Sequence, residues 1–164
     1  MVRLSQEGMT FIEIIIVVAI LGILASFAAV EFSDSLTSVQ SGTAVEKVAS
    51  DVRFAQQLAL SYGEEVRVHV DLAQNEYSLK WSDGSYVDNP AGGGNFVVRF
   101  GQGNYSNVEI TNVGFANGRL DFDAGGRPLN SGSDFSGSLG LLTINNERTI
   151  VIAANTGFVS IEEL

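Results

Sequence analysis

The feature that most constrains this chain is an uncharged apolar run close to its N-terminus. Residues 14–30 read IIIVVAILGILASFAAV, 17 residues without a charge, and Glu13 stands directly before them. Counted from Met9 the stretch has 22 residues, which as a helix span ~33 Å, about one bilayer core. We therefore predict a transmembrane helix over residues 9–30. Its apolar side chains include Ile14, Val17, Ile20, Leu21, Leu24 and Val30.

A carboxylate at the edge of such a span is costly unless it has a partner or is neutral. Three interpretations of Glu13 compete. The stretch could be an ordinary signal peptide cleaved near residues 26–29, where small residues occur. It could be a plain single-pass anchor, with Glu13 reaching back to water from the interface. The third interpretation also uses Gly8, which precedes Met9.

The segment GMTFIE, with Gly8 followed by Met9 and Glu13 before the apolar run, resembles the type III signal of type IV pilins and type II secretion pseudopilins. The resemblance implies that a prepilin peptidase and N-methyltransferase removes the leader, residues 1–8, and methylates the amine of Met9. It also implies that Glu13 pairs with the N-terminal amine of an adjacent subunit in a filament. The family usually has Phe where this chain has Met9.

The helical pattern continues beyond the apolar run and becomes amphipathic over residues 31–63. Apolar residues recur at steps of three and four, which indicates one stripe that packs on the sheet of the same domain. The stripe consists of Val45, Val48, Val52, Ala55 and Ala59, with Leu58 on its flank. No proline interrupts the chain before Tyr62, and Gly63 is the expected stop.

A β-rich head is expected over residues 64–164. Val66, Val68, Val70 and Leu72 alternate with polar residues and predict a half-buried strand with His69 on its solvated face. Gln74-Asn75 predicts a hairpin turn to a second strand over residues 76–81, and residues 82–95 predict a loop. Further antiparallel strands are predicted over residues 96–100, 108–113, 119–123, 139–144, 149–153 and 157–161. The fold class is α+β, a long N-terminal helix packed on an antiparallel β-sheet head.

The stretch DFDAGGRPL, residues 121–129, is the second informative segment. Asp121 and Asp123 alternate with Phe122, so both are expected to point away from the core, into solvent. A Ca²⁺ site there lacks a full set of oxygen ligands, and a strand end running into a Gly-Gly turn is the preferred interpretation.

The same segment carries a second resemblance. Phe122, Asp123, Gly126, Arg127 and Pro128 are similar to the FDxxGRP turn of the GspH/FimT-like branch of the pilin family. The C-terminal pattern of an apolar strand, Thr156-Gly157 and a short last strand is similar to that branch as well. The resemblance implies a pilin-like fold and, most of all, an H-type minor pseudopilin of type II secretion.

The amino-acid composition argues against several classes of function. The chain has no cysteine, one histidine and no visible nucleophile–base set, so we expect neither an enzyme, nor a metal site, nor a cofactor. Nine Lys and Arg face 19 Asp and Glu, a net charge of −10, and this acidity disfavours nucleic acid as a partner. The alternatives are a FimT-type or FimU-type minor pilin of a type IV pilus and a membrane-anchored periplasmic binding domain.

For the pseudopilin, the resemblance implies a single-pass protein of the bacterial inner membrane. Its N-terminus would be cytoplasmic, weakly supported by Arg3, and its head periplasmic. The expected partners are other pseudopilins or minor pilins in a filament, the prepilin peptidase and the inner-membrane assembly platform.

Overall fold

The computed structural model describes residues 9–164, with the side chains of residues 28–34 outside that description. Its longest element is α1 (Phe11–Tyr62). The chain divides into two compact units, one ending at Ser38 and one running from Val39 to Leu164. The dividing point lies inside α1, so one helix contributes to both units.

The end of α1 follows the expected signal. Gly63 has φ +66°, a left-handed conformation that glycine adopts without steric cost. Its N–H donates to the carbonyl of Ala59 at 2.9 Å, which closes the last turn. The prediction that the helix stops at Gly63 is confirmed.

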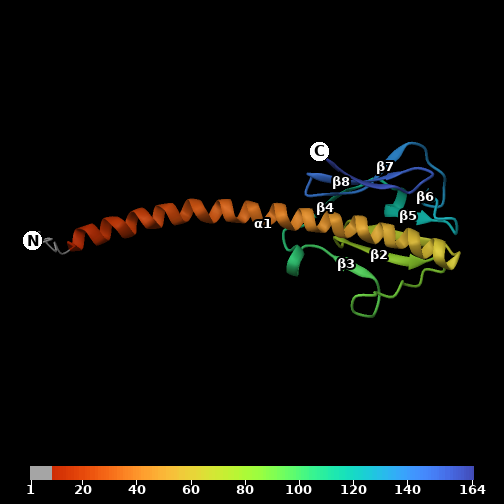
Figure 1. Cartoon of the computed structure of the whole chain (residues 1–164), viewed down its shortest axis with the longest axis horizontal. Coiled ribbons are helices and arrows are strands. Elements are labelled where there is room, and N and C mark those ends of the chain that lie inside the picture. The colour runs from red at the N-terminus through yellow and green to blue at the C-terminus, as the bar shows by residue number, and fades with distance from the viewer. Residues whose placement is uncertain (1–8) are drawn as a thin grey trace, which may run out of the picture. The chain divides into compact units, whose positions relative to one another are not determined.

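The amphipathic stripe of α1 is also confirmed. Its five residues are completely buried or nearly so, and they form one core with the strands of the head. Leu58, on the flank, is partly buried against the same core. Burying one such valine contributes about 1.5–3 kcal/mol, so the stripe fastens α1 to the sheets. In Figure 1, β2 and β3 are drawn on one side of this part of α1, and β7 and β8 on the other.

The first sheet has five strands in the order β3-β2-β1-β5-β6. Their bounds are β1 (Val66–Asp71), β2 (Glu76–Trp81), β3 (Val97–Arg99), β5 (Arg119–Phe122) and β6 (Pro128–Asn130). All neighbouring strands pair antiparallel, and β1 and β2 form the predicted hairpin, with Asn75 at φ +52° in its turn. Leu72 was expected on the buried side of β1, which is wrong. It lies beyond the strand end and is 50 % exposed.

The second sheet has four antiparallel strands in the order β4-β7-β8-β9. They are β4 (Ile110–Val113), β7 (Ser138–Ile144), β8 (Arg148–Ala153) and β9 (Val159–Glu163). Two short 3-10 helices, η1 (Gly103–Tyr105) and η2 (Ala116–Gly118), lie between strands in the sequence. Of the nine strands, the sequence did not predict β6, which has three residues and begins with proline. The α+β class, a helix packed on antiparallel sheets, is confirmed.

Within the part of the chain whose side chains are described, no helix combines the length and the apolar character needed to cross a membrane. The predicted span over residues 9–30 includes Val30, whose side chain lies outside that part.

Candidate functional site

The helix start brings Glu13 into contact with Thr10. The Glu13 N–H donates to the Thr10 hydroxyl, and the Thr10 N–H donates to Glu13 Oε2, both at 3.4 Å. This reciprocal pair is a capping box, which satisfies backbone N–H groups that the first turn of a helix leaves free. No role for Thr10 was predicted from the sequence, although T-x-x-E before an apolar run is the signal for this motif. Glu13 therefore has a partner within its own chain.

The processing site is only partly visible. Gly8 lies outside the described residues, so the cut between Gly8 and Met9 and the methylation of Met9 stay predictions. The apolar side chains that follow are uncovered in the single chain. Those predicted to face lipid are 43–58 % exposed, namely Ile14, Val17, Ile20, Leu21 and Leu24. An apolar surface of this extent indicates a binding or membrane surface.

The predicted family turn is a compact, hydrogen-bonded loop between β5 and β6. Asp123 Oδ1 accepts from the N–H groups of Gly125 and Arg127, each at 2.9 Å, and Oδ2 accepts from Arg127 Nε at 3.1 Å. Partial burial raises the pKa of Asp123, but these donors outweigh it and hold that pKa below its ordinary value. The turn returns the chain antiparallel, with Phe122 opposite Pro128.

One side chain of α1, Gln56, makes hydrogen bonds both to this turn and to the β8–β9 turn of the other sheet. Gln56 Nε2 donates to the carbonyls of Gly126 and Thr156, both at 2.8 Å. Gly157 has φ +67°, and a Cβ on it would lie 2.5 Å from Gln56 Nε2 and 3.0 Å from Phe122 Cε1. The sequence singled out both glycines but not Gln56. We call these three residues, Gln56, Gly126 and Gly157, the clasp.

Gly126 meets the helix equally closely. It has φ +72°, and a Cβ there would lie 2.8 Å from Leu60 Cγ. Both turns of the clasp therefore need a residue without a side chain, because of backbone conformation and because α1 leaves no room. The clasp ties the β5–β6 turn and the β8–β9 turn to the same helical stretch.

The expectation that Asp121 is solvated is wrong. Its side chain is completely buried, and its Oδ1 accepts from Arg119 Nε at 2.6 Å. Strand alternation does place Asp121 on the face opposite Leu120 and Phe122, but there its carboxylate lies against Arg119 and, at 3.7 Å, Arg67. Among the side chains that the structure describes, no group of three or more acidic or histidine residues is placed to hold a metal ion.

A buried polar contact joins α1 to β2. Tyr77 donates its hydroxyl to Asp51 Oδ2 at 2.6 Å, and Lys47 Nζ donates to Asp51 Oδ1 at 2.6 Å. Burial, and then the neighbouring Asp51 carboxylate, raise the pKa of Tyr77 well above its ordinary value. The phenol therefore stays a hydrogen-bond donor at every physiological pH, and the contact is structural.

Comparison with known proteins decides the family. The model of the family "Type II transport protein GspH" matches residues 44–157, more than half of the chain. The chain belongs to this family. The "Prokaryotic N-terminal methylation motif" matches residues 3–29, over the apolar run and its approach. The resemblance to GspH-type pilins and pseudopilins is thus confirmed, and this family is structural, not a family of enzymes.

The chain is similar to two fimbrial proteins. Two proteins called "Fimbrial protein" from Pseudomonas aeruginosa are each 31 % identical to this chain over 84 residues. The match covers 51 % of this chain and 54 % of theirs, so the chain spans about half the length of the curated relatives it matches. No solved structure matches the chain.

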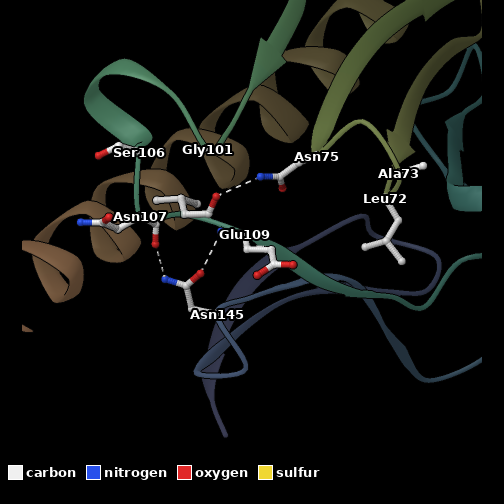
Figure 2. A pocket seen from close by; sticks show the side chains of 9 residues that line it. Leu72, Ala73, Asn75, Gly101, Ser106, Asn107, Glu109 and Asn145 are labelled. Carbon is white, nitrogen blue, oxygen red and sulfur yellow. Dashed lines mark hydrogen bonds between the residues drawn. The ribbon is translucent and has the colours of Figure 1, made fainter.

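A hollow in this GspH-family head has a volume of about 420 Å³ and is shown in Figure 2. Two of the amide side chains that line it are already engaged. Asn75 donates to the Val108 carbonyl (3.0 Å) and accepts from the Ile110 N–H (2.8 Å), while Asn145 accepts from the Glu109 N–H (2.8 Å). These two amides make hydrogen bonds to the backbone of residues 107–110 that a neighbouring strand would otherwise make. Asn75 lies in the β1–β2 turn of the first sheet, and Asn145 lies in the β7–β8 turn of the second. Asn75 and Asn145 therefore have a structural role here, and their amides are unavailable to a ligand.

Proposed function

We propose that this GspH-family chain is a minor pseudopilin, a structural subunit near the tip of the periplasmic pseudopilus of a type II secretion system. The observation that carries the proposal is the contrast within α1. Beyond Val39 the sheets of the head bury one apolar face of the helix, whereas apolar side chains over residues 9–27 are exposed on all sides. A chain built in this way needs neighbours along its first unit, which a membrane and then a filament supply.

In the proposed sequence of events, the chain enters the inner membrane with its head in the periplasm. The prepilin peptidase cuts between Gly8 and Met9, removes residues 1–8 and methylates the new amine. The inner-membrane assembly platform then passes the helix into a filament, where apolar side chains exchange lipid for neighbouring helices. Glu13 pairs with the N-terminal amine of an adjacent subunit, adding a charged partner to its contact with Thr10.

A type IV pilus is the alternative setting, and the fimbrial relatives are the observation that favours it. The charge argues for secretion. From residue 31 onward the chain has 8 Lys and Arg against 17 Asp and Glu, a net charge of −9, whereas a pilin that takes up DNA needs a basic surface. Genes for a secretin and further pseudopilins beside this gene would decide for secretion, and a pilus operon would decide against it.

Two measurements test the subunit role. The intact mass of the processed chain is expected to show loss of residues 1–8 and gain of one methyl group. Cleavage near Ala28 instead would identify an ordinary signal peptide and overturn the filament assignment.

The second measurement compares variants of Glu13 for membrane insertion and filament yield. Glu13→Ala should insert normally and fail to assemble. Glu13→Gln keeps an oxygen for the Thr10 N–H and removes the charge, so it separates helix capping from pairing with an amine. We expect it to fail like Glu13→Ala. Glu46→Ala, at an exposed site of the same helix, is the control and should assemble. Normal assembly of both Glu13 variants would show that the charge is incidental.

A further inference from the structure

The strand at each edge of a β-sheet has backbone groups that a strand of another molecule can pair with. The two sheets of the head end in four such strands, β3 and β6 in the first sheet and β4 and β9 in the second. Natural proteins protect such edges with short strands, prolines, charges, bulges or covering segments. An edge strand without protection favours association of folded heads.

Three of the four edge strands have recognisable protection. β3 has three residues and ends in the charged Arg99, and β6 has three residues and begins with Pro128. β4 has four residues and an irregular register after Ile110. Asn75 also accepts from the Ile110 N–H and donates to the Val108 carbonyl at the same edge. These features leave little backbone for another strand to pair with.

The fourth edge strand, β9, lacks most of these features. It has five residues, more than any of the other three, and contains neither proline nor glycine. It pairs with β8 in an unbroken register. Its two charged residues, Glu162 and Glu163, lie at its C-terminal end, so the edge over residues 159–161 carries no charge of its own.

The hydrogen bonds to β8 show which backbone groups of β9 face outward. The carbonyl of Phe158, directly before β9, accepts from the Ala153 N–H at 3.0 Å. Backbone groups alternate between the two sides of an antiparallel strand. The N–H and carbonyl groups of Val159, Ile161 and Glu163 therefore face away from β8, toward a side on which the described part of the chain has no strand.

One of these outward groups has a partner from α1. Arg53 Nη2 donates to the Val159 carbonyl at 3.1 Å. Among the described side chains, no carboxylate oxygen lies within 4 Å of an Arg53 nitrogen, so the guanidinium is not held by a carboxylate. Arg53 also lines a hollow of about 370 Å³ beside the start of β9. A strand that paired here would have to displace or bury this charge, which is costly.

We propose that Arg53 protects the β9 edge from pairing with a strand of another subunit. The strand that fits this edge is β9 of a second copy, antiparallel about a two-fold axis at Ile161. Glu163 of one copy would then lie opposite Val159 of the other, and the Val159 carbonyl would accept from the Glu163 N–H. In the single chain, Arg53 occupies this same carbonyl. The proposal concerns the head alone, so its failure would leave the proposed function standing.

Self-association of the full-length chain in detergent, measured by sedimentation, tests this role. Arg53→Ala frees the Val159 carbonyl and should raise the association constant on the order of tenfold, the effect of one hydrogen bond to a charged group. The substitution makes an acidic chain more acidic, and the added repulsion alone would weaken association. An Arg53→Ala chain that associates no more than the wild type would overturn the proposal.

Lys80→Ala is the matched control. It removes one positive charge from β2 in the other sheet, and no carboxylate of the described chain lies within 4 Å of Lys80 Nζ. It should associate like the wild type, since any contact through the apolar part of α1 is common to all variants. An increase equal to that of Arg53→Ala would assign the effect to net charge and overturn the proposal.

A second substitution locates the contact. Glu163→Pro removes the outward N–H that the Val159 carbonyl of a second copy would accept, and it removes no hydrogen bond to β8. Arg53→Ala combined with Glu163→Pro should therefore return to the association constant of the wild type. If the double variant associates as strongly as Arg53→Ala alone, the contact is not made by β9 and the proposal is wrong.

Hydrogen exchange of single backbone amides provides a site-specific readout. In the wild type the outward N–H of Ile161 should exchange fast, while the N–H of Ser160, which faces β8, should be protected. In associated Arg53→Ala chains the Ile161 N–H should become protected as well. Association that leaves Ile161 unprotected would contradict pairing through β9, and protection of Ile161 already in the wild type would show that something other than Arg53 covers the edge.

Discussion

The two parts of α1 use apolar residues in opposite ways. Over residues 14–27 the helix is apolar on every side, and its side chains are exposed in the single chain. Over residues 45–59 apolar residues form one stripe, and the sheets bury it completely. An amphipathic stripe matches a single opposing surface, whereas a helix that is apolar all round needs surroundings on every side. The pattern of apolar residues thus separates the part that folds within the chain from the part that needs other molecules.

The acidic residues of the two parts differ in the same sense. Glu13 contacts Thr10, three residues away, through exposed hydrogen bonds. Asp51 is buried and contacts Tyr77, 26 residues away, across the helix–sheet interface. The exposed carboxylate of Glu13 is accessible to a partner from another molecule, whereas the buried carboxylate of Asp51 is not.

The largest expected effect comes from placing a charge in each part. Val52→Asp puts a carboxylate into the buried stripe and should cost on the order of 4 kcal/mol or more, enough to prevent the head from folding. Val18, at 62 % exposed, is the matched position, and Val18→Asp should leave thermal unfolding of the head unchanged. Circular dichroism of the full chain in detergent measures both. Equal destabilisation by the two variants would show that the parts do not differ as described.

A smaller effect is expected at the clasp. Gly157→Ala should destabilise the head by about 2–4 kcal/mol, because alanine is strained at φ +67° and its Cβ meets Gln56. Gly63→Ala is the control, since Gly63 has nearly the same φ (+66°) with nothing within 4 Å of a Cβ. It should cost only about 1–2 kcal/mol. Denaturant unfolding of both variants isolates the crowding at α1, and equal losses would show that the clasp has room.

The smallest effect concerns pH. Asp123→Asn removes the charge of the β5–β6 turn while keeping an oxygen for its backbone donors. Because the pKa of Asp123 is lower in the folded than in the unfolded chain, its charge stabilises the fold above the unfolded pKa, about 3.9. That stabilisation is lost as pH falls through the folded pKa. The variant should therefore be about 0.5–1 kcal/mol less stable at pH 7.

Unfolding free energies measured from pH 7 to pH 2 should converge for the wild type and Asp123→Asn at the acid end. Asp134→Asn is the control, because Asp134 contacts the same Arg127 (3.3 Å) but is 73 % exposed. It should show a smaller difference at every pH. If the wild type and Asp123→Asn still differed in unfolding free energy at pH 2, the loss of stability would come from altered geometry of the turn and not from the lost charge.

Much of the head could be predicted because its signals are local. The helix end at Gly63, the stripe of α1 and the bounds of β2 all follow from spacing and turn chemistry within a few residues. The first residues of the helix are equally local, and T-x-x-E would have predicted the contact between Thr10 and Glu13.

Alternation along a strand, in contrast, predicts on which face of the sheet a side chain lies. It does not predict whether other parts of the chain bury that face. It places Asp121 on the face opposite Phe122 correctly, yet Asp121 is completely buried beside Arg119 and Arg67. The prediction that Leu72 is buried is also wrong, because the strand ends one residue earlier and leaves Leu72 50 % exposed.

By itself, then, the sequence determined a long helix with an apolar first part, a stripe for a sheet, a head of antiparallel strands and a pilin-type start. Tertiary structure alone decided that the strands form two sheets and that Gln56 holds a turn of each. The partners of Gln56 are 70 and 100 residues away, and no periodicity in a local window connects such positions. Burial and long-range hydrogen bonds depend on which distant segments meet, and that is settled only when the whole chain packs.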